Sequence, residues 1–139
     1  MSAKRFVDSN ILIYAHNADA GEKHRVAGAL LRDLWEARDG RLSTQVLQEF
    51  YVNVTRKIKH PLPRAEAREI IRNYALWVEH PTTATTVARA SELEELAQLS
   101  FWDALIVASA EAHGAHELIS EDLQHGQTIA GVRVRNPFT

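Results

Sequence analysis

The stretch RFVDSNILIY, residues 5–14, decides how the rest of the chain can be organised. Its first three residues form a short, mostly apolar segment, as a buried β-strand would, and the segment ends at Asp8. The apolar run 11–14 follows at once and favours a short helix. In open α/β sheets, functional groups gather at the carboxyl ends of the strands. Asp8 is therefore the first candidate for a functional residue.

Helical and extended patterns alternate along the rest of the chain. In the segment 22–38, apolar residues recur at three- and four-residue steps, which predicts an amphipathic helix. Further helices are expected at 44–58, where Thr44 can provide the cap, and at 64–76, 85–99 and 101–113. Short strands are expected at 41–43, 77–79, 117–119 and 132–134. This order predicts a single α/β domain over residues 1–139, with a short, mostly parallel central β-sheet flanked by helices.

The composition is that of an ordinary globular domain: 139 residues, 45% hydrophobic and 24% charged. The chain has no cysteine, which excludes disulfides and thiolate zinc sites. No apolar run approaches the ~20 residues of a membrane helix, and the apolar stretch near the N-terminus is too short for a signal peptide. The sequence thus predicts a cytoplasmic protein that does not enter a membrane.

The net charge of −2 means that bulk electrostatics would not attract a polyanion to this chain. Nucleic acid could then be held only by bound cations or by a local basic patch. The densest run of cations is RKIKH, residues 56–60. This run is either such a patch or a solvated helix end, where the helix dipole favours cations.

Two further acids stand where a catalytic site could use them. Asp122 follows the expected strand 117–119, as Asp8 follows the strand 5–7. Asp103 is the only charged residue in the segment 96–110, and a carboxylate at the edge of so apolar a helix is costly unless it is paired or binds a metal.

Each candidate acid also has an ordinary structural interpretation. Asp8 can cap the helix that follows it, and Ser100 and Asp103 have the spacing of a capping box. Asp122 can stabilise a turn. Glu49 lies off the main apolar stripe of its helix, where most glutamates are solvated.

The seven histidines include no pair with the HExxH spacing of a helical zinc site. We expect surface or loop positions for all seven, with His125, three residues after Asp122, placed where it could touch a ligand. The chain also lacks the GxSxG, P-loop and GxGxxG motifs.

In their order along the chain, five short segments resemble the PIN-domain nucleases. They are FVDSNIL (6–12), STQVLQEF (43–50), FWDALI (101–106), ISEDL (119–123) and the closing NPF (136–138). The resemblance extends over essentially the whole chain, from the first segment to the last, and four acid-bearing motifs in this order are fairly specific. In length and single-domain organisation the chain most resembles the VapC-type toxins of toxin–antitoxin pairs. The resemblance implies a PIN-like three-layer fold.

The resemblance also implies which side chains form the site. The four metal-binding acids of the family are matched by Asp8, Glu49, Asp103 and Asp122. Ser120 matches a small hydroxyl residue near that site, and Asn10 matches a polar residue that helps to orient it. Glu121 has no fixed role: it either supplements Asp122, which lies in the most variable motif, or is exposed.

Four carboxylates brought together would repel one another, and divalent cations remove this cost. Oxygen ligands suit Mg²⁺ or Mn²⁺. In a two-metal site, with the ions roughly 3.5–4 Å apart, one ion activates water for in-line attack on a phosphodiester and the other stabilises the leaving oxygen. The resemblance thus implies a metal-dependent endoribonuclease that acts on RNA.

A toxin of this kind would have a small antitoxin partner encoded nearby, which docks on the helices and blocks the acidic pocket. It would also form a homodimer. The apolar surfaces of the helices within residues 22–76 could serve either contact.

Two alternatives belong to other functional classes. A HAD-like phosphotransferase also begins with an aspartate after the first strand, but it needs a second aspartate two residues later, where this chain has Asn10. A catalytically inactive PIN-type interaction module would use the acids only as caps, and such a module has no need to keep all four together.

Overall fold

The structure is a computed structural model that describes residues 3–139. Its centre is a five-stranded sheet in the order β2 (Gly40–Arg41), β1 (Arg5–Val7), β3 (Glu117–Ile119), β5 (Val132–Arg135) and β4 (Thr128–Ile129). The pairs β1–β2, β1–β3 and β3–β5 are parallel, and the edge strand β4 runs antiparallel to β5. The predicted α/β fold with a short, mostly parallel sheet is confirmed.

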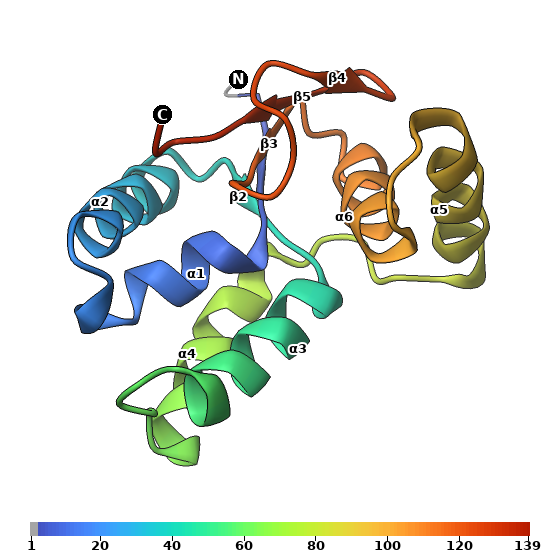
Figure 1. Ribbon diagram of the computed structural model, residues 1–139. Coiled ribbons are helices and arrows are strands. Elements are labelled where there is room, and N and C mark those ends of the chain that lie inside the picture. Colours follow the sequence, from blue (N-terminus) through green and yellow to red (C-terminus); the bar gives the residue numbers. More distant parts are fainter. Residues whose placement is uncertain (1–2) are drawn as a thin grey trace.

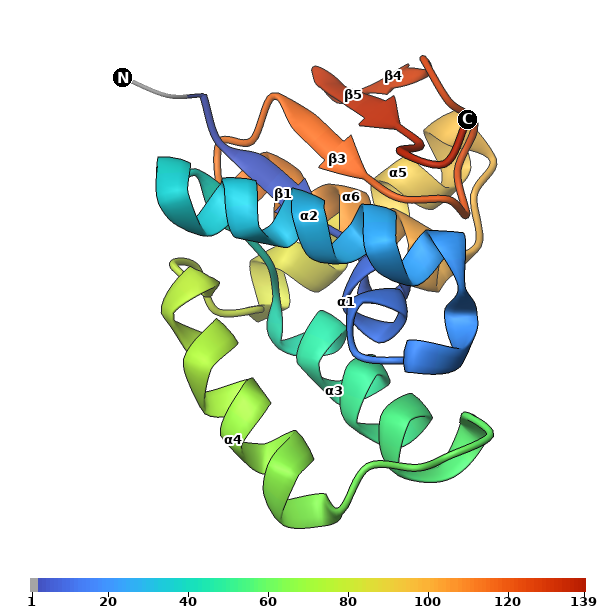
Figure 2. The same ribbon diagram turned by 90° about the vertical axis from the view of Figure 1, so that its left-hand side faces the viewer.

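Helices cover both faces of this sheet. They are α1 (Ser9–Ala15), α2 (Glu22–Ala37), α3 (Thr44–Val52), α4 (Arg64–Tyr74), α5 (Ala84–Ala97) and α6 (Phe101–Ala112). Figure 1 shows α1 and α2 on one side of the strands and α5 and α6 on the other, and the turned view in Figure 2 agrees. The helices α3 and α4 form a hairpin that projects beyond the ends of the strands. Within the described residues, no helix is long and apolar enough to cross a membrane.

The two central strands, β1 and β3, supply the middle of the core. Four of their side chains are completely buried: Phe6, Val7, Leu118 and Ile119. A strand covered on both faces requires a continuous apolar run rather than an alternating one, which explains how such short segments are held as strands. The register pairs Val7 with Ile119, so the chain leaves the sheet at Asp8 and Ser120 side by side.

The predicted strand 77–79 is wrong. The chain instead forms a short 3₁₀ helix, η3 (Ala75–Trp77), before it turns towards α5. The carbonyl of Trp77 accepts one hydrogen bond from the N–H of Leu42 at 3.2 Å, and no ladder follows it. The Trp77 indole is buried against Gly40 of β2. Packing of this side chain, and not strand pairing, therefore holds the segment against the sheet.

The strand predicted at 41–43 is shorter and lies one residue earlier. Ser43 has left the sheet because its hydroxyl caps α3, where it accepts a hydrogen bond from the N–H of Val46 at 3.4 Å. The cap predicted for Thr44 is thus made by Ser43. The helix predicted at 44–58 changes after α3 into a π-helical segment, η2 (Asn53–Lys57). The sequence does not predict β4, because this strand has two residues and depends on its pairing with β5.

The sequence predicts surface or loop positions for the histidines. His113 lies in the turn that follows α6, but it is buried there rather than exposed. Its Nδ1–H donates to the carbonyl of Ser109 at 2.8 Å, and its Nε2 accepts from the backbone N–H groups of Glu79 at 3.2 Å and His80 at 3.1 Å. Burial lowers the pKa of His113 and keeps the ring neutral, as these bonds require. His113 is therefore a structural link between α6 and the segment before α5.

Gly40→Ala is expected to destabilise the fold by about 1–3 kcal/mol, because the added Cβ would lie 2.8 Å from carbons of the Trp77 ring. Urea unfolding would measure the loss. The matched control is Gly28→Ala inside α2, where the nearest atom to the new Cβ is 4.0 Å away and alanine favours the helix by up to ~1 kcal/mol. A Gly40→Ala protein as stable as the parent would contradict the tight contact.

Candidate functional site

Asp8 lies directly after β1 and is buried, with 4% of its surface exposed. One carboxylate oxygen accepts a 2.7 Å hydrogen bond from the N–H of Ser9, so Asp8 caps α1. The other accepts a 2.7 Å hydrogen bond from the hydroxyl of Ser120. Burial raises the pKa of Asp8 to about 7, although both hydrogen bonds lower it. The negative charges of Asp122 and Glu49 add to the rise of this pKa, which indicates that both acids lie near Asp8.

Asn10 and Ser120 connect Asp8 with Asp122. The amide Nδ2 of Asn10 lies 3.4 Å from Oδ2 of Asp8 and 3.0 Å from Oδ2 of Asp122. The hydroxyl of Ser120, which donates to Asp8, accepts from the N–H of Asp122 at 3.1 Å. Asn10 also accepts from the N–H of Glu121 at 3.4 Å. The start of α1 and the loop after β3 are therefore joined by a network that includes two of the four predicted acids.

Glu121 makes a different set of contacts from its neighbour Asp122. Its carboxylate forms a salt bridge with Lys23 of α2 at 2.8 Å and accepts a hydrogen bond from the hydroxyl of Tyr14. The Lys23 ammonium also lies over the Tyr14 ring, 5.0 Å from its centroid. Glu121 thus anchors the loop to α1 and α2, whereas Asp122 contacts the Asn10 amide.

Glu49 and Asp103 reach this region from other helices. Glu49 is half-buried on α3, and its charge contributes to the raised pKa of Asp8. Asp103 is half-buried in the first turn of α6, where its N–H donates to the Ser100 hydroxyl at 3.1 Å, as a capping arrangement requires. Burial raises the pKa of Asp103, a hydrogen bond with Ser100 lowers it, and the charge of Asp122 raises it again.

Three residues that sequence reasoning missed support this arrangement: Gln45, Tyr14 and Lys23. The buried Gln45 side chain donates from Nε2 to the carbonyl of Trp102 at 3.2 Å, and so ties α3 to α6 beside Asp103. Gln45 could have been suspected, because it lies one helical turn before Glu49 on the same face. Tyr14 and Lys23 carry no local signal, since their role depends on Glu121, about a hundred residues away.

The donor set has the chemistry of a hard divalent cation site. All four predicted ligands are carboxylates, and the pKa shifts show that some of them repel one another. Within residues 3–139, no three Asp, Glu, His or Cys side chains are close enough to form a ready-made cage. Mg²⁺ does not need one, because it is usually held by one or two carboxylates and keeps several waters. The residues present therefore fit Mg²⁺ or Mn²⁺.

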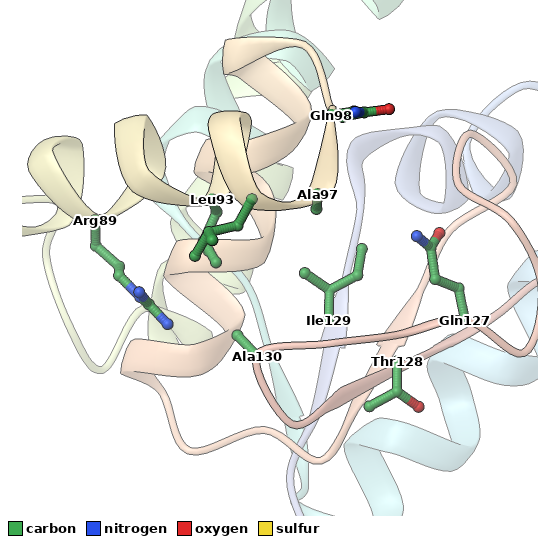
Figure 3. A pocket seen from close by; sticks show the side chains of 9 residues that line it. Arg89, Leu93, Ala97, Gln98, Gln127, Thr128, Ile129 and Ala130 are labelled. Carbon is green, nitrogen blue, oxygen red and sulfur yellow. The ribbon is translucent and has the colours of Figure 1, made fainter.

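The chain also has a pocket of about 510 Å³ between α5 and β4 (Figure 3). Leu93 and Ala97 face Ile129 and Ala130 across it, and Arg89 and Gln127 stand at its edges. None of the predicted acids lines this pocket. The candidate site is thus the group of acids beyond β1 and β3, and this pocket is separate from it. His125 is exposed, and its Nδ1 accepts from the N–H of Asn136 at 2.9 Å.

Asp8→Asn is expected to stabilise the metal-free protein at pH 8. The pKa of Asp8 is about 7 in the folded protein and near its ordinary value of 3.8 in the unfolded chain. The folded state therefore loses stability as pH rises from about 4 to 7, and the full cost, up to about 4 kcal/mol, applies above pH 7. Asparagine carries no charge and caps helices equally well.

Urea unfolding in EDTA at pH 8 and pH 4.5 would measure this difference. The stabilisation by Asp8→Asn should be large at pH 8 and small at pH 4.5, whereas the exposed Asp33→Asn in α2 should show no such trend. A variant that is equally stable or less stable than the parent at pH 8 would rule out a costly buried charge.

Comparison with known proteins gives one family and a consistent set of relatives. The family model of the PIN domain matches residues 5–128. Ribonuclease VapC24 from Mycobacterium tuberculosis is 27% identical over 141 residues, which cover 96% of this chain and 96% of the relative. A toxin–antitoxin complex from Klebsiella pneumoniae contains a chain with a TM-score of 0.69 and 22% identity, covering 96% of this chain and 98% of that chain.

A second similar fold is the Mycobacterium tuberculosis toxin VapC20, described as cleaving the sarcin–ricin loop. Its TM-score is 0.59 and its identity is 22%, with 83% of this chain and 87% of that chain covered. At these identities the structural likeness establishes the fold, which agrees with the three layers described above.

Proposed function

Because the chain belongs to the PIN domain family, we propose that it is a Mg²⁺- or Mn²⁺-dependent endoribonuclease that hydrolyses phosphodiester bonds in RNA. The observation that carries this proposal is the link between Asp8 and Asp122 through Asn10 and Ser120. The similarity to ribonuclease VapC24 supports RNA as the substrate class.

In this proposal Asp8, Glu49, Asp103 and Asp122 would hold the metal, one or two of them directly and the others through the waters that Mg²⁺ keeps. When bound there, Mg²⁺ or Mn²⁺ neutralises the carboxylates, activates water for attack on the phosphodiester and stabilises the leaving oxygen. Ser120 holds the Asp8 carboxylate through its hydroxyl, and Asn10 keeps Asp122 beside it. We assign the fourth ligand to Asp122 and not to Glu121, because Lys23 and Tyr14 already bind the Glu121 carboxylate.

The other functional classes receive no comparable support. In a HAD-like phosphotransferase the residue two positions after Asp8 would exchange a proton with substrate. Here that residue is Asn10, an amide that donates to two carboxylates. An inactive interaction module would have no use for a carboxylate that is buried at the cost described for Asp8.

The purified protein should cleave structured RNA with Mg²⁺ or Mn²⁺ and lose this activity in EDTA. Asp8→Asn or Asp103→Asn should abolish cleavage while the circular dichroism spectrum stays unchanged. Glu95→Gln on the exposed side of α5 is the matched control and should leave the rate unaltered. Equal cleavage in EDTA, or in both aspartate variants, would exclude the mechanism.

The assignment of the fourth ligand can be tested separately. Asp122→Asn should remove activity as completely as Asp8→Asn. Glu121→Gln should keep part of it, with a loss of roughly 10- to 100-fold, which is typical of groups that orient metal ligands. A greater loss from Glu121→Gln than from Asp122→Asn would reverse the assignment.

We further propose that the nuclease is the cytoplasmic toxin of a toxin–antitoxin pair and acts as a homodimer. The likeness to chains of toxin–antitoxin complexes supports a protein partner. Apolar grooves suited to such contacts lie on the helices within residues 22–76. One groove, between α3 and α4, is lined in part by Leu47, Tyr51 and Ile71, and another by Trp35, Ile70 and the exposed Leu76.

Expression of the chain alone should therefore arrest growth of a bacterial host, because uncontrolled RNA cleavage stops protein synthesis. The Asp8→Asn variant, expressed to the same level, should not. Co-expression of the small protein encoded beside the gene should restore growth and co-purify with the chain. Normal growth on expression of the active chain would contradict the toxin role but not the nuclease chemistry.

A further inference from the structure

The tip of the α3–α4 hairpin carries most of the surface cations that have no acidic partner. We call this group the cationic tip: Arg56, Lys57, Lys59, Arg64 and Arg68. All five are exposed, and within residues 3–139 none of them forms a salt bridge. Most cations elsewhere are paired, for example Arg5 with Asp39. The segment 56–68 contains one acid, Glu66, so the tip is strongly positive on a chain whose net charge is −2.

The helix dipole does not account for this concentration of charge. Arg56 and Lys57 lie in the last turn of η2, where a dipole favours cations. Arg64, however, is the first residue of α4, and Arg68 follows one turn later. Cations at the start of a helix are disfavoured by its dipole. Helix stability therefore does not explain why both the end of η2 and the start of α4 are positively charged.

The backbone of the tip is anchored to the rest of the fold. The N–H of Leu62 donates to the carbonyl of Val54 at 2.8 Å, and Ile58 and Leu62 both pack against the core. His60 pairs with Asp19, in the 3₁₀ turn η1 (Ala18–Ala20) that follows α1, at 2.6 Å. The five cations therefore project from a fixed scaffold.

One continuous helical segment, α3 followed by η2, connects Glu49 of the proposed active site with the tip. Glu49 is seven residues before Arg56, which corresponds to about two turns or roughly 10 Å along the helix. The helix α1, which Asp8 caps, packs against α3 and leads to η1, where Asp19 pairs with His60, the residue next to Lys59 of the tip. A polyanion bound at the acids would therefore have to extend by only roughly 10 Å along the helix to reach Arg56.

We propose that the cationic tip binds the phosphate backbone of the RNA substrate beside the bond that is cleaved. This inference rests on the proposed nuclease function. A protein partner would need apolar anchors at such a surface, but among residues 3–139 the exposed large apolar side chains are Leu76, Val87, Leu96 and Trp102, and none belongs to the tip. Contacts with phosphate groups need only exposed cations that are placed along the path of the nucleic-acid backbone. The tip supplies the positive charge that an acidic catalytic pocket lacks.

Two double variants test the two sides of the tip: Arg56→Gln with Lys57→Gln, and Arg64→Gln with Arg68→Gln. The matched control, Arg32→Gln with Arg133→Gln, removes the same charge from exposed, unpaired positions elsewhere. Binding of a fluorescent single-stranded RNA would be followed by anisotropy over a salt series, in the Asp8→Asn background with Mg²⁺. Each tip variant should bind about tenfold more weakly, and the slope of log affinity against log salt should fall by about 1.4, the value for two lost phosphate contacts.

Cleavage by the otherwise unaltered enzyme separates binding from chemistry. The tip variants should raise KM for a long RNA about tenfold with kcat unchanged, and a dinucleotide substrate, which has no phosphate besides the one that is attacked, should be cleaved as before. If tip variants and control have the same affinity and salt slope while the parent cleaves RNA, the tip proposal is wrong and the nuclease function stands. If the parent binds RNA through the tip but cleaves none with either metal, the proposed nuclease function is wrong instead.

Discussion

The hydrogen bond from the Ser120 hydroxyl to the Asp8 carboxylate joins residues 112 positions apart, at the point where the two central strands end. It is possible only because β1 and β3 are parallel and in register, with Val7 beside Ile119. Both partners are buried, so each needs the other to replace water. The covering helices, the short apolar strands and the loop after β3 all serve to hold this polar contact at the edge of an apolar core.

Burial of the charged Asp8 carboxylate costs free energy, and the neighbouring side chains partly offset this cost and partly add to it. Ser9, Ser120 and Asn10 donate to its carboxylate, whereas Asp122 and Glu49 oppose its charge. The result is a carboxyl group whose pKa of about 7 lies close to physiological pH. A buried carboxyl group with a raised pKa is typical of catalytic centres, where side chains are arranged to bind a ligand rather than to stabilise the empty site. In the proposed function that ligand is a divalent cation.

The fold was largely predictable from the sequence where the signal is local. The strand that ends at Asp8 and the apolar helix around Asp103 both follow from a few neighbouring side chains. Interpretation failed where the outcome depends on distant partners. Trp77 packs against Gly40 in place of strand pairing, and His113 is buried because two backbone N–H groups from another segment need its Nε2.

The candidate site was predictable to the same extent. Asp8 and Asp103 stand out by local context, and their caps are present in the structure. Glu49 has no local signal, because its placement near Asp8 depends on how α3 packs against α1. The different surroundings of Glu121 and Asp122 could not be read from two adjacent acids, since Tyr14 and Lys23 on other helices decide them.

The different contacts of Glu121 and Asp122 also limit how the loop after β3 can vary in evolution. The Ser120 hydroxyl donates to Asp8, the Glu121 carboxylate pairs with Lys23, and the Asp122 carboxylate accepts from Asn10, so three consecutive side chains point to three different residues. An insertion or deletion of one residue between Ile119 and Asp122 would shift this register, so that at least one of the three side chains would lose its partner. Length changes are therefore expected to be tolerated only after Asp122, so drift in this part of the gene is restricted to substitutions.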